Sequence, residues 1–101
     1  MPKAPRTPRF SSHDPLLDAR VAETLDLHGL SATEARPAVR SLLKRHRSGT
    51  VLHVVTGKGR GSAGGPVLRS LVSGMLKGEL GPLVADWSLD DSDGGFRIRV
   101  R

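Results

Sequence analysis

The pattern of apolar and polar positions along the chain predicts four strands and two helices. Short segments in which apolar residues alternate with polar ones, or follow one another without a break, are typical of strands. Apolar residues spaced by three or four positions indicate helices. The elements follow in the order βαβαββ. The predicted strands are residues 22–28, 51–55, 83–89 and 96–101, and the predicted helices are residues 32–47 and 66–77.

The first predicted strand ends with two ionisable residues, Asp26 and His28. Because successive side chains of a strand point to opposite faces, Leu25 and Leu27 share one face and Asp26 and His28 share the other. A carboxylate and an imidazole then lie together at the carboxyl end of this strand. Ligands usually bind at that end in open α/β sheets, so the pair is a candidate site.

The first predicted helix begins with a capping-box pattern, in which Ser31 is the N-cap and Glu34 follows three residues later. Pro37 lies past the first turn, where its missing N–H is expected to kink the helix. A start at Thr33 is the alternative, because it places Pro37 among the positions whose N–H groups are unpaired in any helix. The apolar stripe of this helix consists of Ala35, Val39, Leu42 and Leu43.

A basic stripe runs along the other side of the same helix. It consists of Arg36, Arg40, Lys44 and Arg47. We predict that Arg36 and Arg40 bind nucleic-acid phosphate, although a charged helix face turned to solvent is the commoner explanation of such a stripe.

The remaining segments complete the sheet and its helical layer. Residues 51–55 are apolar on both faces, as expected of a central parallel strand. A right-handed crossover is expected to join this strand to the first one. His53, which lies within the strand, is expected to be a hydrogen-bonded structural residue. Strict alternation in residues 96–101 predicts a hairpin partner of the third strand and a charged edge strand with three outward arginines.

The third strand is expected to have one apolar face, which consists of Leu83, Ala85, Trp87 and Leu89. The second helix is opened by Pro66 and is expected to bury Val67, Leu68, Leu71, Val72, Met75 and Leu76. The predicted fold is an α+β two-layer sandwich, with a mixed four-stranded sheet and two helices.

Composition narrows the class of protein. The 101 residues have a net charge of +6, which favours a polyanionic partner such as nucleic acid. The chain has no cysteine, no apolar segment long enough to span a membrane and no signal-peptide pattern, so a cytoplasmic location without membrane association is expected. Prolines and basic residues dominate the start of the chain. We therefore predict a disordered basic tail at residues 1–20 and one domain at residues 21–101.

A glycine-rich loop follows the second strand. Residues 56–65 contain five glycines and the cations Lys58 and Arg60, and a helix start follows them. Such a loop binds phosphate, because its backbone N–H groups and the helix dipole favour an anion. A Walker A loop is rejected because Lys58 has no Ser or Thr beside it. A dinucleotide fingerprint, with Asp86 about twenty residues after the loop, is disfavoured because the chain is too short for a second mononucleotide-binding half. Gly57, Lys58, Gly59 and Arg60 are therefore predicted to bind a nucleic-acid phosphate.

The topology should bring this loop next to Asp26 and His28, because parallel neighbouring strands end at the same edge of a sheet. A histidine there can act as general acid or base, and loop cations can stabilise charge in the transition state. Asp26 then orients His28 or binds a metal. The alternative is that Asp26 only caps the turn at Gly29 and that His28 packs within it.

The segments Leu25-Asp-Leu-His-Gly29 and Thr56-Gly-Lys-Gly59, in this order, and the turn at Gly94-Gly95 resemble the Smr (small MutS-related) domain family. The resemblance covers about residues 22–101 and suggests a stand-alone member. It implies a βαβαββ sandwich similar to the C-terminal domain of translation initiation factor three. It also implies nucleic-acid binding and, in several members, endonuclease activity on DNA or RNA.

Carried over position by position, the resemblance assigns roles to two groups of residues. Asp26 and His28 match the residues implicated in cleavage, and Gly57, Lys58 and Gly59 match the second motif. The third motif departs from the family, because Phe96 and Arg97 stand where members often have a further glycine.

The expected function is therefore an endonuclease domain that cleaves phosphodiester bonds in RNA or structured DNA. The alternatives are a non-catalytic module for structured or branched nucleic acid and, less favoured, a small-nucleotide binder. RNA is slightly preferred. Ribosome association and a monomer are expected. No cofactor is assigned. A divalent metal stays open, although a two-metal mechanism is disfavoured because no second carboxylate clearly joins Asp26.

Overall fold

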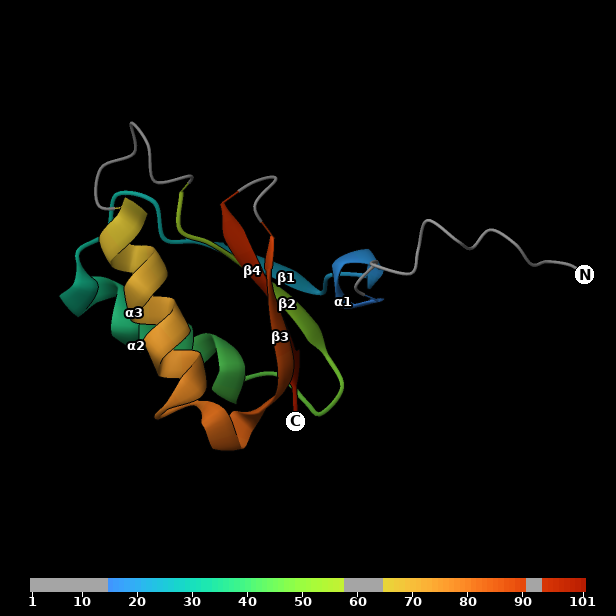
Figure 1. The fold of residues 1–101 in the computed structure, drawn as a ribbon. Coiled ribbons are helices and arrows are strands. Elements are labelled where there is room, and N and C mark those ends of the chain that lie inside the picture. The colour runs from blue at the N-terminus through green and yellow to red at the C-terminus, as the bar shows by residue number, and fades with distance from the viewer. Residues whose placement is uncertain (1–14, 58–64, 91–93) are drawn as a thin grey trace, which may run out of the picture.

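The computed structural model describes residues 15–57, 65–90 and 94–101, which form one sheet with helices on both of its faces (Figure 1). The elements follow in the predicted order, with a short additional helix at the start and a 3₁₀ turn before the third strand. Their bounds are α1 Pro15–Asp18, β1 Glu23–Asp26, α2 Ala32–Lys44, β2 Val51–Val55, α3 Gly65–Lys77, η2 Gly81–Leu83, β3 Val84–Asp90 and β4 Gly95–Val100.

The sheet is mixed and has the strand order β1-β2-β4-β3. β1 pairs in parallel with β2, so that Asp26 lies opposite Val55. β4 is antiparallel to both of its neighbours, β2 and β3. The predicted α+β fold, with a mixed four-stranded sheet and two main helices, is confirmed.

The core lies between one face of the sheet and the two long helices, which Figure 1 shows side by side on that face. The apolar stripe predicted for α2 is fully buried there, and the alternating residues of β4 meet it from the sheet. These burials stabilise the fold because they remove apolar surface from water. The buried set includes Leu27, Ala35, Val39, Leu42, Leu43, Leu52, Val54, Leu68, Val72, Met75, Leu76, Phe96 and Ile98.

The start of α2 follows the capping-box prediction. The Glu34 backbone N–H donates to Ser31 Oγ at 3.2 Å, and the Ser31 N–H donates to Glu34 Oε1 at 2.9 Å. The alternative start at Thr33 is therefore wrong, and Pro37 lies inside the helix. Since proline has no N–H, the carbonyl of Thr33 loses its helical donor there. The helix ends at Lys44, earlier than predicted, so Arg47 lies beyond it.

The second face of the sheet is covered in part by α1, which Figure 1 places on the side away from α2 and α3. Leu16 is only 3% exposed, and Arg97 Nη1 donates to the carbonyl of Leu17 at 3.3 Å. The chain therefore contacts the domain within the segment predicted as a tail. Residues 1–14 of that predicted tail lie outside the described residues.

The prediction that the last strand is a charged edge strand is wrong. β4 is central, and the edges of the sheet are β1 and β3. The strand tolerates its arginines because they lie on the second face, where carboxylates of β3 pair with them. Arg97 Nη2 lies 3.4 Å from Asp90 Oδ2, and Arg99 Nε lies 3.4 Å from Asp86 Oδ1.

Two predicted apolar positions are also wrong. The register between β3 and β4 shifts between Val84 and Asp86, so Val84 is buried and Ala85 is exposed, although the alternation predicted Ala85 in the apolar face. A bulge of this kind places two successive residues opposite one partner. Val67 of α3 is 60% exposed, because it lies on the outer face of the helix with Ser70 and Gly74, whereas its neighbour Leu68 is fully buried. No helix in the described part of the chain is long and apolar enough to cross a membrane.

Candidate functional site

A tight turn follows β1 and presents His28. The Leu27 N–H donates to the carbonyl of Val55 at 2.7 Å, which continues the pairing of β1 with β2 by one residue, and the Leu27 side chain is fully buried. The Leu30 N–H then donates to the carbonyl of Leu27 at 2.9 Å, which closes a turn around His28 and Gly29. Gly29 has a φ of +87°. This left-handed backbone at the third turn position favours glycine, and it explains the Gly that follows His28.

Asp26 and His28 are both exposed, as the alternation predicted, while Leu27 between them is buried. Asp26 Oδ1 accepts a hydrogen bond from the His28 backbone N–H at 2.9 Å. This contact of a carboxylate with a backbone N–H two residues later is a common turn-stabilising arrangement. The carboxylate therefore holds the turn that carries the imidazole, and the contacts between these two described residues include no bond from carboxylate to imidazole.

The Thr56–Gly57 segment of the second motif is hydrogen-bonded to Gly94 of the third motif. The Thr56 side chain is fully buried, and its Oγ1 donates to the carbonyl of Gly94 at 2.9 Å. The N–H groups of Thr56 and Gly57 donate to the same carbonyl at 2.9 and 3.1 Å. Gly57 and Gly94 have φ values of +100° and +73°. One carbonyl at the start of β4 thus fixes the point at which the loop leaves β2, a role for Gly94 that the sequence did not indicate.

The predicted convergence of the first two motifs is confirmed for the residues that the structure describes. Asp26 and Val55 are partners in the parallel pairing, so the turn carrying His28 and the Thr56–Gly57 segment leave the sheet at the same edge. Lys58, Gly59 and Arg60 lie outside the described residues. Arg69 of α3 also contacts this edge, since its Nη2 donates to the carbonyl of Gly57 at 3.5 Å. The apolar pattern of this helix did not indicate the contact of Arg69 with Gly57.

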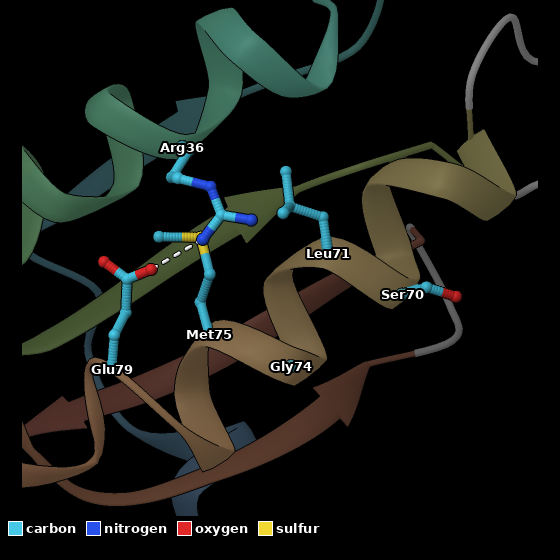
Figure 2. A pocket seen from close by; sticks show the side chains of 6 residues that line it. All are labelled: Arg36, Ser70, Leu71, Gly74, Met75 and Glu79. Atoms are coloured by element: carbon cyan, nitrogen blue, oxygen red, sulfur yellow. Dashed lines mark hydrogen bonds and ion pairs between the residues drawn. The ribbon is translucent and has the colours of Figure 1, made fainter.

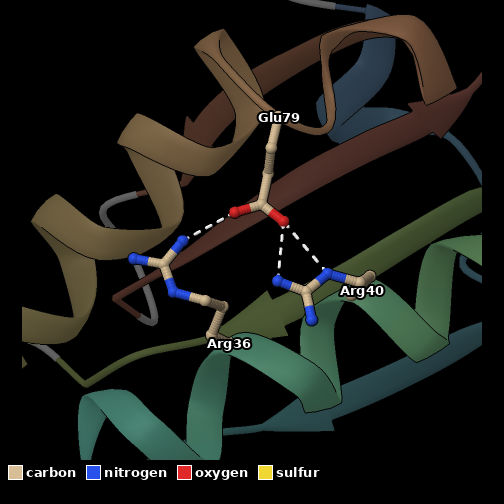
Figure 3. A network of polar contacts seen from close by, with 3 residues as sticks. All are labelled: Arg36, Arg40 and Glu79. Carbon is tan, nitrogen blue, oxygen red and sulfur yellow. Dashed lines mark hydrogen bonds and ion pairs between the residues drawn. The ribbon is translucent and has the colours of Figure 1, made fainter.

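Arg36 and Arg40, predicted to bind phosphate, both contact Glu79 (Figure 3). Arg36 Nη1 lies 2.6 Å from Glu79 Oε1, and Arg40 donates to Glu79 Oε2 from Nε at 3.0 Å and from Nη2 at 2.8 Å. The hydrogen bonds from Arg40 and then from Arg36 hold the pKa of the Glu79 carboxyl below its usual range. Two guanidinium groups thus share one carboxylate, which leaves the cluster with a net positive charge.

The comparison with protein families matches the model of the Smr domain to residues 25–96. The match spans all three motifs, from Leu25 through Thr56 and Gly57 to Gly94 and Gly95. The chain belongs to the Smr domain family. It is therefore a member of a family of nucleic-acid-binding and nuclease-type domains. The searches of curated proteins and of solved structures returned no match.

A pocket of about 340 Å³ lies beside Arg36 in this Smr domain, between α2 and α3. Figure 2 shows the Arg36 side chain reaching across from α2 towards Met75 and Glu79. Asp26 and His28 do not line this pocket. It is lined by Arg36, Ser70, Leu71, Gly74, Met75 and Glu79.

The described residues of the domain contain no group of three or more His, Asp or Glu side chains placed to hold a metal ion. Asp26 supplies a carboxylate at the site, and one of its oxygens accepts a hydrogen bond from the His28 N–H. The described part of the site thus offers an imidazole, a carboxylate and backbone groups for chemistry.

Proposed function

We propose that this Smr domain is an endonuclease that cleaves phosphodiester bonds in RNA or structured DNA. The observation that carries the proposal is the position of His28, whose side chain is exposed at the carboxyl edge of β1 beside the Thr56–Gly57 segment. An exposed imidazole on a short, hydrogen-bonded turn is accessible to a substrate as large as a nucleic acid. The net charge of +6 favours the approach of that substrate.

The proposed role of His28 is proton transfer. In RNA, the 2′-hydroxyl attacks the adjacent phosphorus while a base removes its proton, and the bond to the 5′-oxygen breaks as that oxygen receives a proton. The products are a 2′,3′-cyclic phosphate and a 5′-hydroxyl. His28 performs one of these two transfers, and Lys58 and Arg60 stabilise the charge that develops on the phosphoryl oxygens. This chemistry makes RNA the preferred substrate.

The role proposed for Asp26 is to hold the turn that presents His28. Its bond to the His28 N–H supports this role. The same bond is also what a purely structural turn would contain. It therefore supports the alternative function as well, a binding module for structured or branched nucleic acid that has no cleavage activity.

A cleavage assay separates the two functions. The purified protein is incubated with labelled RNA and with branched DNA, with and without EDTA, and the product ends are identified. We expect the wild type to cleave, and we expect His28→Ala to lower the cleavage rate by at least about a hundredfold, the lower end of the range for removing a general acid or base. His46→Gln is the matched control, because this imidazole contacts Glu23 at the amino end of β1 and lies away from the site. Full cleavage by His28→Ala would refute the proposed mechanism, and binding without any cleavage by the wild type would establish the module.

Three further expectations accompany the proposal and stay predictions. They are association with ribosomes, a monomeric state and a cytoplasmic location. Each is based on the sequence or on the family resemblance. Co-sedimentation of the protein with ribosomes tests the first, and sedimentation of the purified protein alone tests the second.

A further inference from the structure

A groove of about 330 Å³ lies between α3 and the edge strand β3. Its lining combines two aromatic residues and an exposed leucine with one arginine and two serines. Leu89 is 39% exposed, although it belongs to the face of β3 that packs towards the helices. The lining residues are Arg69, Ser70, Ser73, Trp87, Leu89 and Phe96.

Trp87 is the fixed surface of this groove. Its ring is half-buried and packs on Phe96, with ring centroids 5.7 Å apart and an angle of 52° between the planes. Phe96 is only 1% exposed and belongs to the core. Contacts between tilted rings at this separation are favourable, so the buried ring holds the orientation of the partly exposed one. A planar ligand therefore meets a rigid aromatic surface.

Arg69 joins the groove to the candidate catalytic edge. Arg69 lines the groove, and its guanidinium also donates to the carbonyl of Gly57, just after β2, over a long 3.5 Å. Among the described residues no carboxylate pairs with Arg69, whereas Arg36 and Arg40 are both paired with Glu79. Within the described residues, the guanidinium of Arg69 is therefore placed to contact an anion that lies between the groove and Gly57.

We propose that this groove binds one unpaired nucleobase of the nucleic-acid substrate, next to the bond that is cleaved. The base stacks on Trp87, the hydroxyls of Ser70 and Ser73 contact its polar edge, and Arg69 contacts the neighbouring phosphate. Such stacking is the usual way in which proteins bind single-stranded nucleic acid. The inference rests on the proposed function for its substrate class and narrows that class to strands with unpaired bases.

Charge and position favour this occupant over a peptide or a second copy of the chain. A second copy would bring another net charge of +6 to a groove that is lined by an arginine. A peptide strand would add to the free backbone edge of β3, which does not require the aromatic ring or the guanidinium. An unpaired nucleotide uses the ring, the hydroxyls and the cation together.

The test uses the fact that Trp87 is the single tryptophan of the chain. The full-length protein is titrated with a short single-stranded RNA and with an abasic strand of the same length, while tryptophan fluorescence and the anisotropy of the labelled strand are recorded. Stacking on Trp87 predicts quenching by the RNA and none by the abasic strand. Trp87→Leu is expected to weaken RNA binding about tenfold, and Trp87→Phe is expected to retain most of the affinity.

Two further variants keep the test decisive if Trp87→Leu folds poorly. Arg69→Gln should weaken RNA binding and lower its salt dependence, whereas Val67→Ser, an exposed residue of the same helix outside the groove, should change neither. Equal quenching by the RNA and by the abasic strand would overturn the proposal. Unchanged RNA binding in both Trp87→Leu and Arg69→Gln would also overturn it, as would a loss of fluorescence that depends on the protein concentration and not on the RNA concentration. Base-dependent quenching without any cleavage would refute the endonuclease and leave the groove assignment standing. Cleavage without quenching would do the reverse.

Discussion

At the scale of single residues, Asp26 has two roles that a substitution can separate. Its Oδ1 holds the backbone of His28, and its negative charge lies beside the site. Asp26→Asn retains an oxygen that accepts the His28 N–H but removes the charge, whereas Asp26→Ala removes both. If Asp26 only holds the turn, cleavage by Asp26→Asn should stay within a few-fold of the wild type, and cleavage by Asp26→Ala should fall much further.

Steady-state cleavage rates of the two variants, with thermal unfolding as a control for folding, provide the measurement. Equal and large losses in both variants would show that the charge itself is required, either to stabilise a protonated His28 or to bind a metal. Unchanged cleavage in both would remove Asp26 from the mechanism altogether.

The geometry around Asp26 shows why part of the site was predictable. The alternation of Leu25, Asp26, Leu27 and His28 is local, and a half-buried strand has only one way to orient it, so the exposure of the two ionisable residues followed from the sequence. The bond from the His28 N–H to the carboxylate belongs to the turn after the strand, and alternation carries no information about it. The sequence left that contact as one of two alternatives, and the structure supplies it.

At the scale of elements, Glu79 contacts Arg36 and Arg40, the two residues of the basic stripe that are predicted to bind phosphate. Glu79 lies just past the end of α3, more than forty positions from Arg36 in sequence. Its contact with Arg36 and Arg40 joins the two helices and neutralises part of their charge (Figure 3). The helical spacing placed Arg36, Arg40 and Lys44 on the helix correctly, although Arg47 lies beyond its end. The carboxylate that contacts Arg36 and Arg40 could not be predicted from that spacing.

Glu79→Gln should therefore release both arginines. If Arg36 and Arg40 bind phosphate, affinity for single-stranded RNA should rise, and the slope of log K against log salt should steepen by about 0.7 for each additional phosphate contact. Asp86→Asn is the matched control, because it removes an equal charge beside Arg99 on the other face of the sheet. Binding unchanged in Glu79→Gln, together with a lower unfolding temperature, would assign the two arginines to the joining of α2 with α3 instead.

A second contact between elements makes stability depend on pH. Glu23 at the start of β1 accepts hydrogen bonds from His46 at 2.7 Å and from Arg45 at 2.5 Å, which ties the strand to the end of α2. These bonds hold the pKa of the Glu23 carboxyl below the ordinary value of 4.5. Since the folded state then binds fewer protons than the unfolded state, the contribution of this contact is complete above pH 4.5 and is lost as the pH falls through the lower, folded pKa.

Unfolding temperatures measured from neutral pH down to below pH 4 should therefore fall in the acid range. Glu23→Gln should be less stable than the wild type at neutral pH, and the difference should narrow in acid because the wild type loses the charge that the variant lacks. A difference that stays constant across the acid range would show that the ion pairs of Glu23 do not contribute to stability. The exposure of the pair makes a small effect the expected one.

At the scale of the whole molecule, the order of the elements was easier to predict than their neighbours in the sheet. Each element has a local pattern, and the order βαβαββ follows from reading those patterns along the chain. The position of β4 between β2 and β3 depends on its pairing with β2, across 40 or more residues. The alternation of Phe96, Ile98 and Val100 is the same for a central strand as for an edge strand. The arginines of β4 suggested an edge only because their partners, Asp86 and Asp90, come from the neighbouring strand.

The charge of the whole molecule yields a final prediction about the N-terminal segment. Residues 1–14 carry Lys3, Arg6 and Arg9, whereas the described contacts of the domain begin at α1 with Leu16 buried. A chain that begins at Pro15 should retain the fold and the cleavage products. It should bind single-stranded RNA more weakly, with a salt slope lower by about 2, because three cations no longer contact phosphate.

A chain that begins at Ala19 is the informative comparison. It also lacks α1, and with it the Leu16 side chain and the Leu17 carbonyl that contact the sheet face carrying Arg97. This second truncation should lower the unfolding temperature, whereas the first should not. If the chain beginning at Pro15 binds RNA with the affinity and salt slope of the full protein, residues 1–14 make no phosphate contact. The charge that attracts the substrate would then belong to the domain itself, including Arg69, which contacts the carbonyl of Gly57.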